Sequence, residues 1–298
     1  GCVKRTDILN GKPVNGYSGC RVRETHRYTL NGKPVNGYSG GFAMWHCRIV
    51  RLASMSILGL IGALAAVGAD VRAAEAVVVM VGSGLGQAAL ELLPPELIGM
   101  MNREKGLGLP EEPSLFCEFH GISDAHLKET AALARELCEE CGAVGFQYAT
   151  GEAERKNLWR ARHEAWETIH RAHPKKETLI VDAAVPISQY PEMVVFSQEL
   201  VERHGVAGYV FGHAGDGNLH VVLVGDPADT QEWSRLEAVN HAIVEKAVMV
   251  GGTCTGEHGV GIGKRKFMEL EHGEGFQLMH RIKNLIDPKG LMNPGKIF

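Results

Sequence analysis

Histidines and a carboxylate gather in two glycine-rich stretches of the sequence. The first stretch, GHAGDGNLH, carries His213 and His220, and the second, TCTGEHG, carries the adjacent Glu257 and His258. Neutral imidazoles and a carboxylate are the usual ligands of zinc-like or manganese-like ions, and a catalytic site keeps about three of them so that one position stays open. His213, His220 and Glu257 supply that number. The two stretches therefore predict a reaction centre that holds a divalent metal.

A strand and a loop would position the two histidines of the first stretch. The run from Asn218 to Val224 is largely apolar and predicts a buried strand. The two-residue period of a strand puts His220 on the same face as Val222 and Val224. His213 precedes the strand in a loop that its glycines allow to approach a ligand closely. A single histidine in such a loop is more often an ordinary turn residue, so the prediction rests on the whole set.

The composition is that of an ordinary globular chain. The 298 residues carry a formal net charge of -4, and 45% of them are hydrophobic. That is enough for one large or two smaller domains, and the lack of a basic excess disfavours nucleic acid as a partner. The seven cysteines are scattered, which argues against a disulfide scaffold. Cys138 and Cys141 form one C-x-x-C pair inside a predicted helix, with no second pair to complete a zinc site.

The N-terminal residues contain a tandem repeat. The sequence LNGKPVNGYSG occurs at residues 9–19 and again at residues 30–40. Two copies are too few for a solenoid, and Asn-Gly and Gly-Lys-Pro form turns. Residues 1–43 are therefore predicted to be an irregular, repeat-containing leader that is either disordered or an artefact of the gene model.

A second unusual piece covers residues 44–70. Arg48 and Arg51 precede an uncharged, Ala- and Gly-rich run from Leu52 to Ala69. Basic residues followed by an apolar stretch resemble a targeting sequence. A membrane helix is the alternative, although the run is only marginally long enough to span a bilayer. The segment is therefore interpreted as targeting-like or membrane-prone.

Short apolar runs alternate with helical stretches through the rest of the chain. The runs that predict strands are Ser114–Phe119, Val144–Tyr148, Leu179–Val185 and Tyr209–Phe211. Taken alone, this alternation favours a parallel α/β sheet.

From about Ala73 to Phe298 the sequence resembles the C-terminal, FAD-linked oxidase domain of the flavin-dependent D-2-hydroxy acid dehydrogenases, most of all those of the cytochrome-linked D-lactate type. The motifs that carry the resemblance are LFCEFHG from Leu115, LWRARH from Leu158, VPIS from Val185, the two glycine-rich stretches, and NPGK from Asn293. The resemblance implies an α+β fold, in which helices cover an antiparallel sheet of ferredoxin-like character and a helical C-terminal segment follows. We therefore expect antiparallel rather than parallel strands.

The resemblance also implies a role for each candidate site residue. The reaction would oxidise a D-2-hydroxy acid such as D-lactate to the 2-oxo acid. Arg162 would bind the substrate carboxylate through its planar guanidinium, with a solvated helix arginine as the alternative. His258 would take the hydroxyl proton, and Asn293 would contact FAD. Zinc or manganese would be held by His213, His220 and Glu257.

Substrate choice and the basic residues near the second stretch are further expectations. Relatives that act on a dicarboxylate resemble this chain near Ile180 but carry a lysine there. The apolar Ile180 therefore favours a monocarboxylate. Lys264, Arg265 and Lys266 are expected to solvate a surface, with contact to a flavin phosphate as the alternative.

Members of the family carry an N-terminal FAD-binding domain of about two hundred residues, and nothing before Ala73 resembles one. Residues 71–298 are therefore expected to be the substrate and metal domain of an FAD-dependent dehydrogenase. The alternative is a flavin-less binding module, or a subunit that complements a separate flavoprotein of the glycolate oxidase or D-2-hydroxyglutarate dehydrogenase type.

The resemblance suggests an electron acceptor and a location as well. Cytochrome c, a quinone or an electron-transfer protein would accept the electrons. The location would be mitochondrial in a eukaryote, and otherwise cytoplasmic or peripheral to the inner membrane.

Overall fold

The structure is a computed structural model, which describes residues 4–9, 12–17, 28–30, 33–35, 59–67, 70–149, 156, 159–160 and 162–298. The chain divides into two compact units, residues 1–57 and residues 58–298. The first unit holds two antiparallel hairpins, one made of β1 (Lys4–Leu9) and β2 (Lys12–Tyr17), the other of β3 (Tyr28–Leu30) and β4 (Lys33–Val35). Both β2 and β4 begin at the lysine of the repeat, so the leader that we expected to be irregular contains regular pairing.

Two antiparallel sheets form the frame of the second unit. The four-stranded sheet has the order β6-β7-β5-β8, and the three-stranded sheet has the order β10-β11-β9. Their strands are β5 (Gly59–Val67), β6 (Gln87–Leu93), β7 (Ser114–Gly121), β8 (Ala143–Ala149), β9 (Glu177–Ala184), β10 (Ala207–Phe211) and β11 (Asn218–Gly225). Every pairing in both sheets is antiparallel, which confirms the expected α+β fold and excludes the parallel sheet that the alternation alone favoured.

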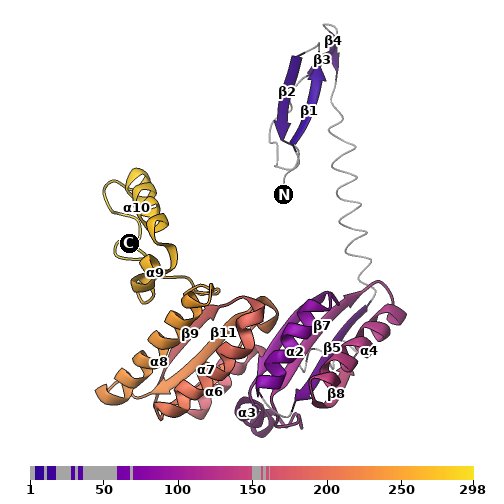
Figure 1. The fold of residues 1–298 in the computed structure, drawn as a ribbon, viewed down its shortest axis with the longest axis vertical. Helices are drawn as coiled ribbons and strands as arrows, with labels where there is room; N and C mark the ends of the chain where they lie inside the picture. The colour runs from indigo at the N-terminus through magenta and orange to yellow at the C-terminus, as the bar shows by residue number, and fades with distance from the viewer. Residues whose placement is uncertain are drawn as a thin grey trace. The chain divides into compact units, whose positions relative to one another are not determined.

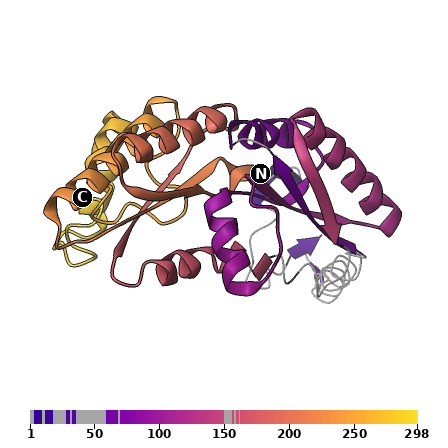
Figure 2. The ribbon, with the colours of Figure 1, turned by 90° about the horizontal axis from the view of Figure 1, so that it is seen from below.

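Helices cover both faces of the sheets (Figures 1 and 2). Four helices lie on one face, where α2 and α4 contact the four-stranded sheet and α7 and α8 contact the three-stranded sheet. Two more, α3 and α6, contact each other on the other face. Their bounds are α2 (Asp70–Gly82), α3 (Pro95–Lys105), α4 (Asp124–Glu140), α6 (Ala165–Ala172), α7 (Tyr190–Arg203) and α8 (Thr230–Met249).

Side-chain oxygens and a glycine mark the ends of these helices. Ser123 accepts a hydrogen bond from the backbone N–H of His126 and begins α4. Asp229 accepts hydrogen bonds from the N–H groups of the first turn of α8, including that of Glu232. Gly106 ends α3 in the left-handed conformation, with φ of 62°. Such caps satisfy backbone groups that a helix end leaves without partners.

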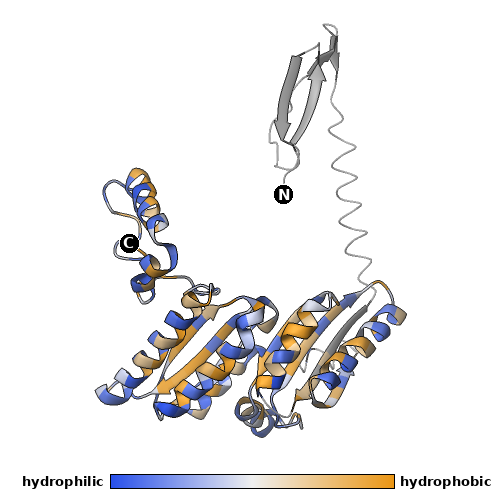
Figure 3. Cartoon of the chain, viewed as in Figure 1, coloured by the Kyte–Doolittle hydropathy of each residue, from blue (hydrophilic) through white to orange (hydrophobic). Residues whose placement is uncertain are grey.

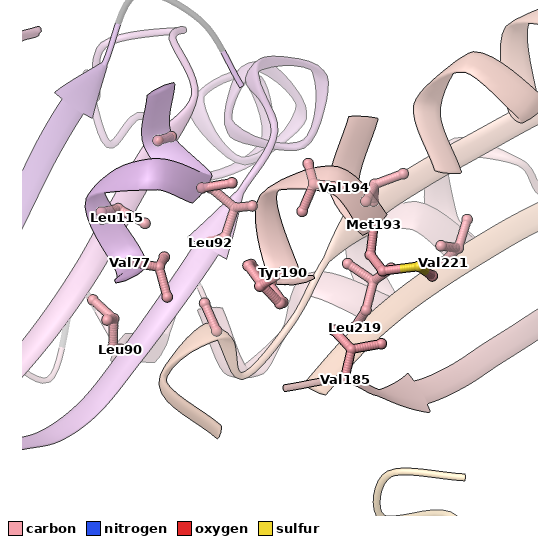
Figure 4. Close-up of a cluster of buried hydrophobic side chains, with 14 of the residues drawn as sticks. Val77, Leu90, Leu92, Leu115, Val185, Tyr190, Met193, Val194, Leu219 and Val221 are labelled. Atoms are coloured by element: carbon pink, nitrogen blue, oxygen red, sulfur yellow. The ribbon is translucent and has the colours of Figure 1, made fainter. Parts of the chain in front are cut away.

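Each face of the sheets has its own hydrophobic core. The strands of the three-stranded sheet are mostly hydrophobic, and the helices that cover them mix hydrophobic and hydrophilic residues (Figure 3). At its centre the fully buried Tyr190 lies between side chains of the four-stranded sheet, such as Leu92, and side chains of β11, such as Leu219 (Figure 4). The two sheets therefore share one core on this face.

The central strand β5 differs from the interpretation of residues 44–70. It pairs with β7 on one side and β8 on the other, and Ala63, Ala65 and Val67 are fully buried. An uncharged run of small, mostly apolar residues is compatible with a central, buried strand as well as with a targeting or membrane segment. The sequence pattern therefore did not distinguish these interpretations. The domain therefore begins before the predicted boundary at residue 71. Residues 44–58, 68 and 69 of that segment lie outside the described ones, and Asp70 begins α2.

Among the described residues, no helix is both long enough and apolar enough to cross a bilayer.

The C-terminal segment is helical, as expected. It comprises η3 (Arg265–Phe267), α9 (Met268–His272) and α10 (Glu274–Ile286). No residue of α10 is buried. Asp287 ends α10 and accepts hydrogen bonds from the N–H groups of Leu291 and Met292 at 2.9 and 2.8 Å.

Candidate functional site

The two histidines of the first glycine-rich stretch lie on and beside β11. His220 lies within the strand, and His213 lies just before the single turn η2 (Ala214–Asp216) that joins β10 to β11. Leu219 and Val221 face the first core, whereas Val222 faces the second. His220 therefore shares a face with Val222, as the two-residue period predicted.

Two glycines of this stretch cannot carry a side chain in the observed backbone. A Cβ on Gly212 would lie 2.3 Å from the carbonyl oxygen of Asn218. Gly217 has a φ of 71°, and a Cβ there would lie 2.1 Å from the carbonyl oxygen of Val185. The glycines thus let the turn fold tightly enough to return His213 to the side of His220.

The second glycine-rich stretch is fastened to the end of β9. Thr253 pairs with Ala184 in an isolated antiparallel bridge, in which the N–H of Thr253 donates to the Ala184 carbonyl at 2.8 Å. The carboxylate of Asp182 then accepts hydrogen bonds from the N–H groups of Glu257 and His258, at 3.1 and 3.0 Å. One buried carboxylate therefore fixes the backbone of both residues that the sequence analysis selected.

Asp182 is ionised and fully buried. Burial alone would raise its pKa, but the N–H of His258 and the nearby Lys264 ammonium outweigh that cost and hold the pKa at about 2. Lys264 donates to both the side chain and the backbone carbonyl of Asp182. The expectation that Lys264 solvates a surface is therefore wrong, because its ammonium neutralises a buried carboxylate.

Three histidines surround the carboxylate of Glu257. Its Oε1 atom lies 3.3 Å from Nε2 of His213, 3.2 Å from Nε2 of His220 and 3.8 Å from Nε2 of His258. The ring of His258 stacks on that of His220, with centroids 5.3 Å apart and an interplanar angle of 11°. The site thus has the two-histidine, one-carboxylate donor set that suits a divalent ion.

Two overlapping groups of these residues have donor atoms within 4.8 Å of one another. One is His213, His220 and Glu257, and the other is Asp182, His220 and His258. The oxygens of Asp182 already accept hydrogen bonds from backbone N–H groups and from Lys264. The first group therefore fits a metal better.

The pKa values of the two histidines shift in opposite directions, and only that of His220 favours the neutral form that a metal ligand needs. The hydrogen bond between Nδ1 of His213 and Oε1 of Glu91, at 2.6 Å, raises the pKa of His213 and directs Nε2 towards Glu257. Burial lowers the pKa of His220 to about 4, so this imidazole is neutral near pH 7. A metal ligand must offer such a lone pair.

Arg162 lies beside this cluster and is only 8% exposed. Its Nε and Nη2 atoms donate to Oε2 of Glu91, at 2.9 and 2.8 Å, and its guanidinium lies over the ring of Phe211. A cavity of about 190 Å³ lies at this cluster, and Trp166, Ile180 and Val222 are among the residues that line it. Five of the predicted site residues line it as well, namely Arg162, His213, His220, Glu257 and His258.

Asn293, the sixth predicted site residue, lies elsewhere. It follows α10 and has a φ of 47°. Its backbone carbonyl and its side-chain oxygen accept hydrogen bonds from Lys296. It is not among the residues that line the cavity.

Sequence reasoning missed two acids of the site, Glu91 and Asp182. Each is the only charged residue in the apolar middle of its strand, LELL in β6 and IVDAA in β9. A charge in such a position requires a buried partner. That signal would have marked both residues, although not the partners they contact.

The sequence is similar to those of known flavin-linked enzymes. The family model described as "FAD linked oxidases, C-terminal domain" matches residues 63–297. The chain is 35% identical over 226 residues to a probable mitochondrial D-lactate dehydrogenase of Danio rerio, covering 76% of this chain and 45% of that protein. It is also 35% identical to the mitochondrial D-lactate dehydrogenase [cytochrome] of Arabidopsis thaliana, covering 76% and 40%. It is 33% identical to the glycolate oxidase subunit GlcD of Bacillus subtilis, covering 76% of this chain and 48% of that protein.

Solved structures share the fold. The 4-ethylphenol oxidase of Gulosibacter chungangensis superposes with a TM-score of 0.59 at 15% identity, covering 80% of this chain and 53% of that one. A p-cresol methylhydroxylase gives 0.58 at 10% identity, covering 80% and 52%. The chain spans about half the length, or less, of the curated relatives described here.

Proposed function

Because the chain belongs to the family of the FAD linked oxidases, C-terminal domain, we propose that it forms the substrate- and metal-binding part of an FAD-dependent dehydrogenase. The substrate would be D-lactate or a similar D-2-hydroxy acid, and the product the 2-oxo acid. The observation that carries the proposal is the convergence of His213, His220 and Glu257 on a cavity that Arg162 also lines. The D-lactate dehydrogenases among its relatives support the choice of substrate.

Arg162 would bind the substrate carboxylate. A guanidinium has five N–H donors in a fixed plane, and Glu91 accepts from two of the three nitrogens, so donors remain for a second carboxylate. Burial beside Phe211 keeps water away from this pair and strengthens it. Ile180 and Val222 on the same cavity offer no partner for a second carboxylate of the substrate, which favours a monocarboxylate.

His258 would take the proton of the substrate hydroxyl. Its side chain is 46% exposed and lines the cavity, and its backbone is fixed by Asp182. An imidazole suits this task because its ordinary pKa lies near neutral pH. As the proton passes to His258, the C2 hydrogen leaves with its electron pair and the C2–O bond becomes a carbonyl.

Two groups would supply the remaining chemistry. A zinc or manganese ion held by His213, His220 and Glu257 would act as a Lewis acid and template at the hydroxyl. FAD would supply hydride acceptance, and Asn293 remains the contact proposed for it in this chain. The relatives named as cytochrome-type enzymes support cytochrome c as the final electron acceptor, with a quinone or an electron-transfer protein as alternatives, and relatives named as mitochondrial support that location in a eukaryote.

A second candidate is a hydroxy-acid and metal-binding subunit that works with a separate flavoprotein. The Bacillus subtilis relative is named as a subunit of glycolate oxidase, which favours this candidate. Complementation separates the two. A chain that gains dehydrogenase activity with a separately expressed flavoprotein would support the second candidate, whereas one that gains none would support the first.

Isothermal titration calorimetry of the chelator-stripped chain with zinc and manganese tests the metal site. We expect the wild type to bind one ion, and His213→Ala and Glu257→Ala to lose this binding. His126→Ala removes an exposed histidine of α4 and should bind as the wild type does. A folded wild type that binds neither ion, or variants that bind equally well, would remove the basis of the proposal.

A further inference from the structure

Glu91 is a buried carboxylate in a strand that is otherwise apolar around it. It lies in β6 between Leu90 and Leu92, and only 5% of it is exposed. Burying an ionised carboxylate is costly unless it is paired and hydrogen-bonded. Its partners therefore show what the residue is for.

Each oxygen of Glu91 serves a different part of the candidate site. Oε1 lies 2.6 Å from Nδ1 of His213, a residue of the proposed metal site. Oε2 accepts hydrogen bonds from Nε and Nη2 of Arg162, at 2.9 and 2.8 Å, the residue proposed to bind the substrate carboxylate. One side chain thus connects the two halves of the site.

The backbone on either side of this contact is fixed as well. Leu92 and Gly212 form an isolated antiparallel bridge between the two sheets, with N–H to carbonyl distances of 3.2 and 3.3 Å. Glu91 precedes one residue of the bridge and His213 follows the other. The bridge therefore holds the backbones of Glu91 and His213 next to each other, so that their side chains can meet.

A carboxylate only accepts hydrogen bonds, so it requires the hydrogen of a neutral His213 to lie on Nδ1. The lone pair then lies on Nε2, the atom that faces Glu257 at 3.3 Å. We propose that Glu91 is a positioning residue, which sets the tautomer of His213 and holds the guanidinium of Arg162 beside it. This inference rests on the proposed function, in which His213 binds a metal and Arg162 binds the substrate.

The substitution Glu91→Gln separates the two hydrogen-bonding roles of Glu91, which are to accept from Arg162 and to accept from His213. Arg162 has only donors, so it would take the amide oxygen of the glutamine. The amide NH₂ would then face Nδ1 of His213, which must become an acceptor. The hydrogen of the neutral imidazole would move to Nε2, where it blocks the lone pair that a metal needs.

The direct test is nitrogen NMR of histidine side chains in the full, chelator-stripped chain, under alkaline conditions that leave imidazoles neutral. The His213 signals are assigned by their loss in His213→Ala. We expect the Nδ1–H form in the wild type and the Nε2–H form in Glu91→Gln. Zinc affinity of Glu91→Gln should fall by about 10- to 100-fold, the usual effect of removing the partner of a ligating histidine.

Two further variants make the test specific. Glu104→Gln removes the carboxylate from another Glu–Arg pair, with Arg171, at a more exposed position, and should leave the His213 signals unchanged. In Glu91→Gln/Arg162→Met no guanidinium fixes the amide, which can present its oxygen or its NH₂ to Nδ1, so the Nδ1–H form should lose its exclusive hold without giving way fully to the Nε2–H form. This double variant also avoids an unpaired buried charge and remains informative should Glu91→Gln alone not fold.

The inference and the proposed function fail in different ways. An Nδ1–H form that persists undiminished in Glu91→Gln or in the double variant would overturn the role of Glu91 even if zinc binds. A wild type that binds no zinc but shows the expected tautomers would overturn the metal site and leave the role of Glu91 standing.

Discussion

The three-stranded sheet and the four-stranded sheet supply the candidate site in different ways. The three-stranded sheet and its loops carry His213, His220 and Glu257, and Asp182 of β9 holds the second loop through backbone N–H groups. The four-stranded sheet reaches the cluster through Glu91, which contacts side chains. Asp182 thus fixes the backbone of the second loop, whereas Glu91 orients the side chains of His213 and Arg162, which would bind the metal and the substrate.

This comparison predicts different consequences when either acid is lost. Both acids belong to buried ion pairs, Asp182 with Lys264 and Glu91 with Arg162, so both substitutions should cost stability. Only the substitution of Asp182 also weakens the acceptor of backbone N–H groups, since an asparagine keeps a single, uncharged oxygen. The loop should therefore loosen in one variant and remain ordered in the other.

The largest effect is expected for Asp182→Asn. Its free energy of unfolding should fall by about 3–5 kcal/mol, since the substitution leaves the Lys264 ammonium without its buried partner. Amide hydrogen exchange of Glu257 and His258 should accelerate in this variant but not in Glu91→Gln. Urea denaturation and exchange NMR measure both quantities.

An exposed ion pair provides the control for that substitution. Glu192 pairs with Lys246 at a surface position, and Glu192→Gln should lower the free energy of unfolding by about 0–1 kcal/mol. If Asp182→Asn were as stable as this control, with unchanged exchange at Glu257, Asp182 would not be what holds the loop.

The sequence was sufficient to predict the parts of this site that depend on local pattern. The period of β11 placed His220 correctly, because a strand alternates its side chains whatever it pairs with. Periodicity could not decide between parallel and antiparallel sheets, and it left β5 unrecognised because its run lacks both charge and alternation. Glu91 contacts a residue 122 positions away, and no local pattern encodes such a partner.

A substitution in β9 tests whether the three-stranded sheet also determines the preference for a monocarboxylate over a dicarboxylate substrate. Ile180 lies two residues before Asp182, on the same face of the strand, and lines the cavity. In Ile180→Lys a cation replaces the apolar wall, and a charge-assisted hydrogen bond contributes about 1.5–3 kcal/mol. We expect the ratio of the affinities for D-2-hydroxyglutarate and D-lactate to rise at least about tenfold in zinc-loaded protein.

Calorimetric titration of the same preparation with both acids supplies its own control, because a general loss of binding would lower both affinities. An unchanged ratio would mean that Ile180 does not face the distal end of the substrate.

The smallest effect is expected outside both sheets, at the end of α10. The hydrogen bond from Lys283, followed by that from the N–H of Met292, holds the pKa of Asp287 at about 2, below its ordinary value of 3.8. Because the folded-state pKa is depressed, the contribution of Asp287 to stability is present above pH 3.8 and is lost as the pH falls through about 2.

The amide NMR signals of Leu291 and Met292, which donate to Asp287, report this titration. They should shift with a midpoint at about 2 in the wild type, and they should not titrate in Asp287→Asn. A midpoint near 3.8 would show that the carboxylate does not cap this segment.

The most direct test of the metal site is a crystal structure of the zinc-loaded chain with an anomalous difference map at the zinc edge. One peak is expected about 2.0–2.2 Å from Nε2 of His213, Nε2 of His220 and Oε1 of Glu257. A peak between Asp182 and His258 instead, or no peak at this cluster under saturating zinc, would contradict it.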